Sequence, residues 1–348
     1  MMRSRLSVPA AGRSGWLHLA SASVIAILLA TGTGMAQTAD SAAAPRTPWG
    51  APDLAGVWDF RSLTPFERPA ELAEKALLTD EDQALVLEDA EETWRGIQDG
   101  NPEMPTGSYN EAWYDVEGVG EDRRTSLIVD PRNGRMPRFT AGEQRRMAEQ
   151  ARVRHGLGLH ELTYGGWVAD MGPGHLAVRC LVGFNSGPPM TPSAYNNNMQ
   201  LFQTEDHVVV LNEMVHSVRV IPLDGQPHLD ADIRQQMGDS RGRWDGDSLV
   251  VETTNFLRGT GFQGGQTGRH FRLEERFTRI APETLLYQAT VDDPTVWTTP
   301  WTFELLMNRN DQPLYEYACH EGNYGIYNIL TGQREAEAAM EAAGTGAP

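Results

Sequence analysis

The sequence is poor in basic residues and holds only two cysteines. It has 29 Lys and Arg residues against 47 Asp and Glu residues, which gives a formal net charge of −18. A nucleic-acid-binding surface needs clustered Lys and Arg, and so does docking on anionic lipid, so neither partner is expected. The hydrophobic share of 40% is too high for a disordered chain. The composition therefore indicates a folded, acidic protein.

The motifs of several common enzyme classes are also missing. The chain has no Gly-x-Ser-x-Gly nucleophile turn, no P-loop, no Gly-x-Gly-x-x-Gly leading from a strand into a helix, and no His-Glu-x-x-His. Nothing indicates NAD, flavin or haem, so we expect any catalysis to need no cofactor. Four possible metal ligands lack the local spacing of ligand pairs, and no metal site is predicted. They are His207, Glu213, His216 and His320.

Residues 1–36 have the pattern of a secretory signal peptide. An Arg-containing start is followed by a short apolar run over 24–30, and Gly34-Met35-Ala36 places small residues at a cleavage site. The run is shorter than the roughly 20 apolar residues that span a bilayer, so a membrane anchor is the less favoured alternative. Cleavage would leave 26 basic and 47 acidic residues, a net charge of −21. We therefore predict a periplasmic or secreted protein with no membrane contact after cleavage.

The two cysteines, Cys180 and Cys319, lie far apart in the sequence. An even pair in an oxidising compartment favours a disulfide. Such a bond would close a loop of about 139 residues and contribute about 4–5 kcal/mol in the chain-entropy model. A catalytic or metal-binding thiol is the alternative, which the lack of Cys-x-x-Cys spacing disfavours. The disulfide prediction and the export prediction support each other.

The mature chain reads as a single domain over residues 53–334. A flexible leader over 37–52 precedes it, and a C-terminal tail over 335–348 follows it. No internal repeat or long linker divides the domain. Two helices are expected within it, at about 79–96 and 140–155. The first helix should begin at Thr79 with a capping box, and the second at Thr140 with Glu143; both are insertions in the N-terminal half.

Short segments rich in Val, Leu and Ile fill most of the rest of the chain. Asp245-Gly246, between two such segments, is a strong hairpin signal, and short turns join the later segments in the same way. Serial hairpins predict a mainly β fold, an antiparallel meander closed into a lipocalin-like barrel. The expected strands are residues 54–60, 126–129, 201–204, 207–212, 217–222, 243–244, 248–254, 271–280, 285–291, 301–308 and 314–318.

Two resemblances bear on this fold. Gly56-Val57-Trp58 on the first expected strand is similar to the Gly-x-Trp that opens lipocalin-like (calycin) barrels. The mature chain also resembles a family of secreted bacterial proteins, a resemblance that implies secretion but no particular activity. It is carried by the phrases Thr47-Pro48-Trp49-Gly50, Gly183-Phe184-Asn185, Tyr195-Asn196-Asn197-Asn198, Gly238-Asp239-Ser240-Arg241-Gly242 and Cys319-His320-Glu321-Gly322-Asn323-Tyr324.

The segment Cys319–Tyr324 is the richest candidate for a functional site. His320 beside Glu321 offers a near-neutral acid or base with a carboxylate, and Asn323 and Tyr324 can donate hydrogen bonds to a substrate. Gly322 indicates a tight change of direction after the strand expected at 314–318. The alternative is a disulfide-anchored turn whose polar side chains satisfy loop backbone.

Polar groups also interrupt the apolar segment that begins at His207. Counting with period 2 places His216 on the face of Asn212, and Glu213 on the face of His207. A buried Glu213 needs a partner, so it either faces a cavity as an acid–base group, ends at solvent, or pairs with an arginine. The arginines considered are Arg219, Arg241 and Arg243. For His216 the functional alternative is preferred.

Two more segments supply candidate substrate-binding groups. Tyr195, Asn196 and Asn197 can bind hydroxyl groups, or the asparagines can form Asx turns. Arg241 either binds substrate or makes a structural ion pair. Together the residues predict a cofactor-independent lyase, isomerase or hydrolase for a small polyhydroxylated or aromatic molecule, with His320, His216, Glu321 and Glu213 as acid–base groups. The alternative is a secreted lipocalin-like binding protein without catalysis.

Overall fold

The structure is a computed structural model of the whole chain. It describes residues 45–88, 122–153, 180–257 and 261–344, which belong to one compact unit spanning Ser41–Pro348. The predicted signal peptide and the first part of the predicted leader lie outside the described residues.

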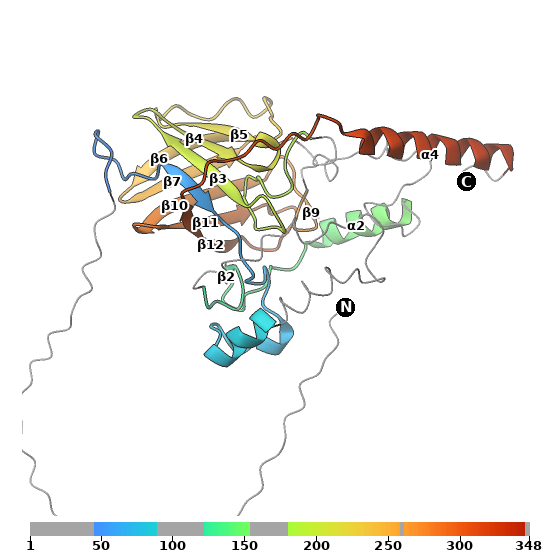
Figure 1. Cartoon of the computed structure of the whole chain (residues 1–348). Helices are drawn as coiled ribbons and strands as arrows, with labels where there is room; N and C mark the ends of the chain where they lie inside the picture. The colour runs from blue at the N-terminus through green and yellow to red at the C-terminus, as the bar shows by residue number, and fades with distance from the viewer. Residues whose placement is uncertain (1–44, 89–121, 154–179, 258–260, 345–348) are drawn as a thin grey trace, which may run out of the picture. The chain divides into compact units, whose positions relative to one another are not determined.

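One antiparallel sheet dominates the described part of the chain (Figure 1). Its strands run in the order β5-β4-β3-β1-β12-β11-β10-β7-β6, with β2 paired to β12, and a separate two-stranded ribbon joins β8 to β9. The expected mainly β, antiparallel fold is therefore confirmed. The strands are β1 (Gly56–Asp59), β2 (Ile128–Asp130), β3 (Asn198–Gln203), β4 (His207–Asn212), β5 (Val218–Pro222), β6 (Asp239–Asp245), β7 (Ser248–Thr254), β8 (Gly261–Phe262), β9 (Gly265–Gln266), β10 (Arg272–Ala281), β11 (Thr284–Asp292) and β12 (Trp301–Asn310).

The two end strands of this sheet, β5 and β6, come close without a ladder between them in the described pairings. A Cβ atom added to Gly242 on β6 would lie 2.9 Å from Cγ2 of Ile221 on β5 and 2.6 Å from Cδ2 of Leu223. Side chains of one end strand thus contact the backbone of the other. The sheet as described is not closed by hydrogen bonds into a barrel.

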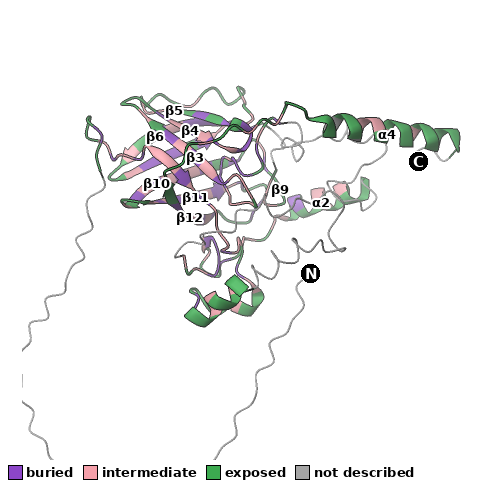
Figure 2. Cartoon of the chain, viewed as in Figure 1, coloured by how far each residue is buried: buried purple, intermediate pink, exposed green. Residues whose placement is uncertain are grey.

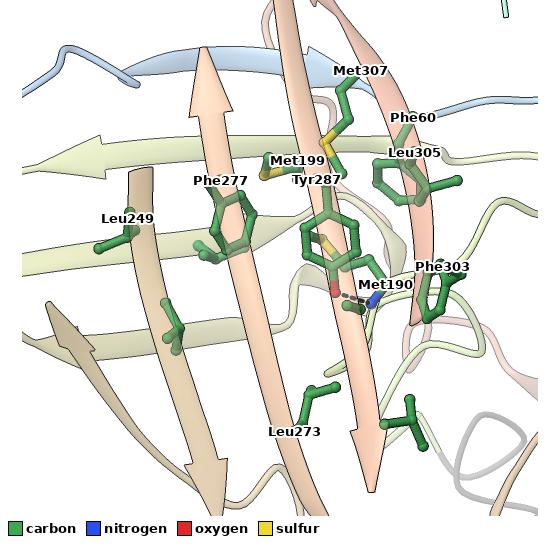
Figure 3. Packing of buried hydrophobic residues seen from close by; sticks show 14 of the residues in the cluster. Phe60, Met190, Met199, Leu249, Leu273, Phe277, Tyr287, Phe303, Leu305 and Met307 are labelled. Carbon is green, nitrogen blue, oxygen red and sulfur yellow. Dashed lines mark hydrogen bonds between the residues drawn. The ribbon is translucent and has the colours of Figure 1, made fainter. Parts of the chain in front are cut away.

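The core follows from the alternation of the long strands. Every second residue of β10, β11 and β12 is buried, as period-2 geometry requires when one face packs inward. Figure 2 shows this burial concentrated on the strands. Phe277, Tyr287 and Phe303 meet in this core, where each fully buried side chain contributes about 1.5–3 kcal/mol (Figure 3).

The helices begin where the sequence predicts them. Residues 80–88 are helical, and α2 spans Ala141–Val153; the expected ends of both helices lie beyond the described residues. At the first helix Thr79 Oγ1 accepts a hydrogen bond from Asp82 N at 3.2 Å, and Asp82 Oδ2 accepts one from Thr79 N at 2.9 Å. This reciprocal pair is a capping box. A short 3-10 turn, η1, spans Ala70–Leu72.

The strand predicted at 314–318 is wrong. Residues 313–318 form no regular element, because β12 already pairs with β11 on one edge and with β1 and β2 on the other. A returning strand therefore has no edge to join. The segment leads instead to α4 (Tyr324–Ala342), a helix where a tail was predicted from residue 335. Its second half is rich in Ala and Glu, which are strong helix formers.

Candidate functional site

A disulfide joins the two segments that carry most of the candidate residues. Cys180 and Cys319 are bonded, with a Cα–Cα distance of 5.8 Å, and both cysteines of the chain are thereby used. The predicted disulfide is confirmed, and the alternative of a free catalytic or metal-binding thiol is wrong. The bond fixes the start of the 180–197 loop against the segment that precedes α4.

The strand predicted at 207–212 is confirmed as β4, and the polar residues that follow it form a turn. β4 stops at Asn212, and the chain turns through the 3-10 segment η4 (Met214–His216). The period-2 assignment of faces beyond Asn212 is therefore wrong. Val215 has φ 57° and His216 has φ 40°, so two successive non-glycine residues are left-handed. Such a conformation costs about 1–3 kcal/mol per residue and is concentrated at functional sites.

This turn orients the imidazole of His216. Nδ1 lies 3.2 Å from the carbonyl oxygen of Tyr317, which can only accept a hydrogen bond, so Nδ1 must donate. In the neutral ring, Nε2 then keeps its lone pair. The side chain is exposed. Because Tyr317 precedes Cys319 by two residues, the His216 turn contacts the segment that carries His320.

A small apolar cluster packs beneath the contact between His216 and Tyr317 and includes residues of both segments. Met214 and Val215 are buried together with Cys180, and Tyr195 and Tyr317 pack against them. The neighbouring loop is closely packed as well, since the Oγ of a buried serine, Ser186, donates to the carbonyl oxygen of Met214 at 2.9 Å. The exposed His216 is therefore carried by a turn whose other residues are buried and closely packed.

The hydrogen-bond partner of Glu213 is the side-chain amide of Asn198. An arginine was one of the partners expected from the sequence. Oε2 of Glu213 accepts a hydrogen bond from Nδ2 of Asn198 at 2.9 Å, and Oδ1 of Asn198 accepts one from Nδ2 of Asn310 at 2.9 Å. Glu213 is half-buried, so this amide is enough to hold its carboxylate. Pairing with Arg219 or Arg241 is wrong, because each has another acid: Glu275 and Asp239 respectively.

Of the two roles expected for Arg241, substrate binding and a structural ion pair, its contacts are those of the ion pair. Nη1 lies 2.9 Å from Oδ1 of the buried Asp239 and 3.0 Å from the carbonyl oxygen of Ser240. Nε donates to the carbonyl oxygen of Pro227 at 3.2 Å. Arg241 thus ties β6 to the loop before it.

The Tyr195–Asn197 segment has one fully buried and two half-buried residues. Asn197 is fully buried; its Oδ1 accepts from Ser193 N at 2.8 Å and its Nδ2 donates to Ser193 O at 2.9 Å, which are the contacts of a turn. Asn196 is left-handed, with φ 54°, and half-buried. Tyr195 packs edge-on against Phe184 at 5.5 Å between ring centroids.

The turn before α4 presents its polar groups to solvent. His320, Glu321, Asn323 and Tyr324 are all exposed. Gly322 has φ 67°, which explains the glycine at this change of direction, and Asn323 N donates to His320 O at 3.3 Å. The turn is held to the loop by the disulfide and by Nδ2 of Asn323, which lies 3.7 Å from Sγ of Cys180.

One exposed residue of this surface, Phe184, was not predicted from the sequence. Phe184 is 52% exposed beside Tyr195, although large apolar side chains are expected to be buried. Its segment, Gly183-Phe184-Asn185, was noticed only as a shared phrase. The glycine has a packing reason, because a Cβ atom there would lie 2.3 Å from Cγ of Met214.

In the described part of the chain, no three His, Cys, Asp or Glu side chains are grouped so that they could hold a metal ion. Among those residues there is also no helix with the length and apolar character needed to cross a membrane. A scan against models of known protein families and a search of curated proteins both give no match for this chain.

Proposed function

We propose that this is an exported protein that binds a small polyhydroxylated or aromatic molecule at the surface around the Cys180–Cys319 disulfide. The observation that carries the proposal is a set of exposed aromatic rings on the two segments that this bond joins. Phe184 is 52% exposed, Tyr315 69% and Tyr324 75%, and each lies within five residues of a disulfide cysteine along the chain. Rings held at solvent on a cross-linked base are ready to stack on a ligand.

The polar groups of the same surface complement the rings. His216 offers Nε2, Glu321 a carboxylate, and Asn323 an amide, all exposed. Amides and carboxylates bind hydroxyl groups, while aromatic faces cover the apolar face of a sugar or phenol. The ligand class therefore follows from the combination of both kinds of group.

The same proposal includes export and a lipocalin-like barrel. The disulfide supports export, because such bonds persist in oxidising compartments. The approach of Ile221 to Gly242 supports closure of the sheet between β5 and β6. The Gly56-Val57-Trp58 motif on β1 and the family resemblance to secreted bacterial proteins point the same way.

A matched pair of phenylalanines tests the binding site. Phe184→Ala removes a ring beside the disulfide, whereas Phe202→Ala removes a similarly exposed ring (45%) on β3. Panels of sugars and phenolics are screened by calorimetry against the purified protein. For a ligand found in this way, we expect Phe184→Ala to weaken binding about tenfold and Phe202→Ala to leave it unchanged. Equal affinity in the two variants would contradict the proposed site.

Catalysis by the same residues is the second candidate, and the geometry of His216 favours it. A fixed Nδ1–H donor and a strained backbone are typical of a histidine that acts as a base through Nε2. His320, Glu321 and Glu213 remain the proposed acid–base partners. If the parent protein consumes a ligand, His320→Ala should abolish turnover with binding retained, and His216→Ala should lower turnover far more than it weakens binding. Ligand capture without turnover in the parent protein leaves the binding function alone.

A further inference from the structure

A pocket lined by basic side chains lies among residues that are far in sequence from the disulfide cysteines. It has a volume of about 800 Å³ and opens beside the first turn of α2 and the residues after β9. Its lining includes Glu143, Arg146, Arg234, Gly268, Arg269 and His270. The volume lies within the range of about 300–1,000 Å³ that small-molecule sites occupy.

The acidic groups at this pocket are bound to other partners. Glu143 is only 4% exposed; its Oε1 accepts from Gln266 N at 2.9 Å and from Nη2 of Arg146 at 2.6 Å. Asp293 is buried and accepts from Gly268 N at 3.1 Å. The two carboxylates therefore hold the backbone of β9 and of the residues that follow it. Although burial opposes it, Arg146 and the amide of Gln266 lower the pKa of Glu143, which keeps this carboxyl ionised.

The remaining cations face the pocket with weak acidic competition. Arg269 lies 3.9 Å from Asp232, and both side chains are largely exposed, at 64% and 91%, so this pair contributes little. Arg234 donates one hydrogen bond from Nη1 to the carbonyl oxygen of Phe256 at 3.0 Å. His270 adds a third basic group. The N-terminal end of α2 adds partial positive charge at Gly142.

The lining holds three guanidinium groups, those of Arg146, Arg234 and Arg269, against the one carboxylate of Glu143, in a chain whose formal net charge is −18. We propose that the pocket binds a small organic polyanion, a molecule that presents two or more carboxylate groups to Arg234, Arg269 and His270. The guanidinium fork matches a carboxylate with two parallel hydrogen bonds. A bare inorganic ion would fill only a small part of about 800 Å³, so an organic body between the anionic groups fits better.

Citrate and its neutral ester, triethyl citrate, test this directly. Calorimetry on the full-length mature protein at low salt should detect citrate binding and no binding of triethyl citrate. Arg269→Ala should weaken citrate binding about tenfold, the effect of losing one charged hydrogen-bond donor. Arg272→Ala is the matched control, because it removes the same charge three residues away at 69% side-chain exposure and does not line the pocket.

The outcomes separate a built site from general charge. Citrate affinity lowered in Arg269→Ala and unchanged in Arg272→Ala supports the pocket. Equal weakening in both variants, equal binding of citrate and triethyl citrate, or no citrate binding at millimolar concentration overturns the proposal. None of these results depends on the disulfide surface, so Phe184→Ala should bind citrate as the parent does.

Discussion

Arg219 and Glu275 form a buried ion pair between β5 and β10, strands that are not neighbours in the sheet. Their side chains are 7% and 0% exposed. Nη2 of Arg219 donates to Oε1 of Glu275 at 2.9 Å, and Nη1 contacts Oε2. The hydroxyl of Tyr287 donates to the same carboxylate at 2.8 Å. It also accepts a hydrogen bond from Met190 N at 3.1 Å, which Figure 3 shows. The pair thus links the end strand β5 to β10, an inner strand near the opposite end of the sheet order.

The first prediction concerns the loss of one member of this pair. Glu275→Leu leaves a buried guanidinium without its carboxylate, and we expect the free energy of unfolding to fall by about 3–5 kcal/mol. The double variant Arg219→Met/Glu275→Leu removes both charges and should recover most of that loss. Urea unfolding of the three proteins measures it. A single variant as stable as the double would show that the pair is not buried as described.

A second prediction follows from the titration of Tyr287. Burial first, and then the charge of Glu275, raise the pKa of Tyr287 well above its ordinary value of 10.0. The unfolded chain ionises this phenol near pH 10, while the folded chain keeps it protonated to higher pH. The contribution of the protonated phenol to the free energy of unfolding is therefore complete below about pH 10. It is lost as the pH rises above 10, by at most about 1.4 kcal/mol per pH unit.

Comparison with Tyr287→Phe isolates this contribution. The variant is expected to be less stable at neutral pH, because Met190 N and Glu275 lose a partner. Its free energy of unfolding should nevertheless fall less steeply than that of the parent between pH 10 and 11.5. Parallel slopes in chemical denaturation would mean that Tyr287 ionises normally in the fold.

The third prediction concerns the capping box at Thr79. A hydrogen bond from Lys75, and then those from Thr79, lower the pKa of Asp82 to about 2 from 3.8. The carboxylate stabilises the folded helix start above pH 3.8, and this effect is lost as the pH falls towards 2. Carbon-detected NMR of the Asp82 carboxyl should show the low pKa, and Lys75→Ala should raise it. An unchanged value in Lys75→Ala would exclude the lysine as its main cause.

The strands were predictable wherever the local sequence decides the outcome. The Val-rich segment 207–212 matches β4, and Asp245-Gly246 forms the turn between β6 and β7, with φ 60° at the glycine as a tight hairpin turn needs. The prediction of a strand at 314–318 was wrong because a strand forms there only if β12 has a free edge to pair with. That property belongs to the whole sheet and is absent from the segment itself.

Of the two residues in the buried ion pair, only Glu275 could have been predicted from the sequence to lie in the core. Period 2 places Glu275 on the face of Leu273 and Phe277, so a carboxylate in the core was open to detection. On β5 hydrophobicity is misleading, because Val218 and Val220 are exposed while Arg219 between them is buried. The candidate site depended in the same way on long-range contacts: the disulfide was predictable, but the His216 turn that meets Tyr317 was not.

The fourth prediction tests the approach of β5 to β6. In Gly242→Ala the new methyl group would lie within 3 Å of the side chains of Ile221 and Leu223, and Ile221 is fully buried. We expect the free energy of unfolding to fall by about 1–3 kcal/mol. Gly332→Ala in α4 is the control: its methyl group meets nothing within 4 Å, and alanine favours the helix by about 1 kcal/mol. Equal stability of the two variants would argue against contact between these end strands.

The last prediction concerns the disulfide itself. Cys180→Ser/Cys319→Ser opens a loop of 139 residues, and the chain-entropy model predicts a loss of about 4–5 kcal/mol in guanidinium unfolding. Without the bond, the segment around Tyr317 is held to η4 mainly by packing and by Nδ1 of His216. We therefore expect hydrogen exchange to rise over residues 311–323 and 213–217 more than in β10 and β11. Uniform exchange across the sheet would show that the bond stabilises the whole fold without ordering the proposed binding surface.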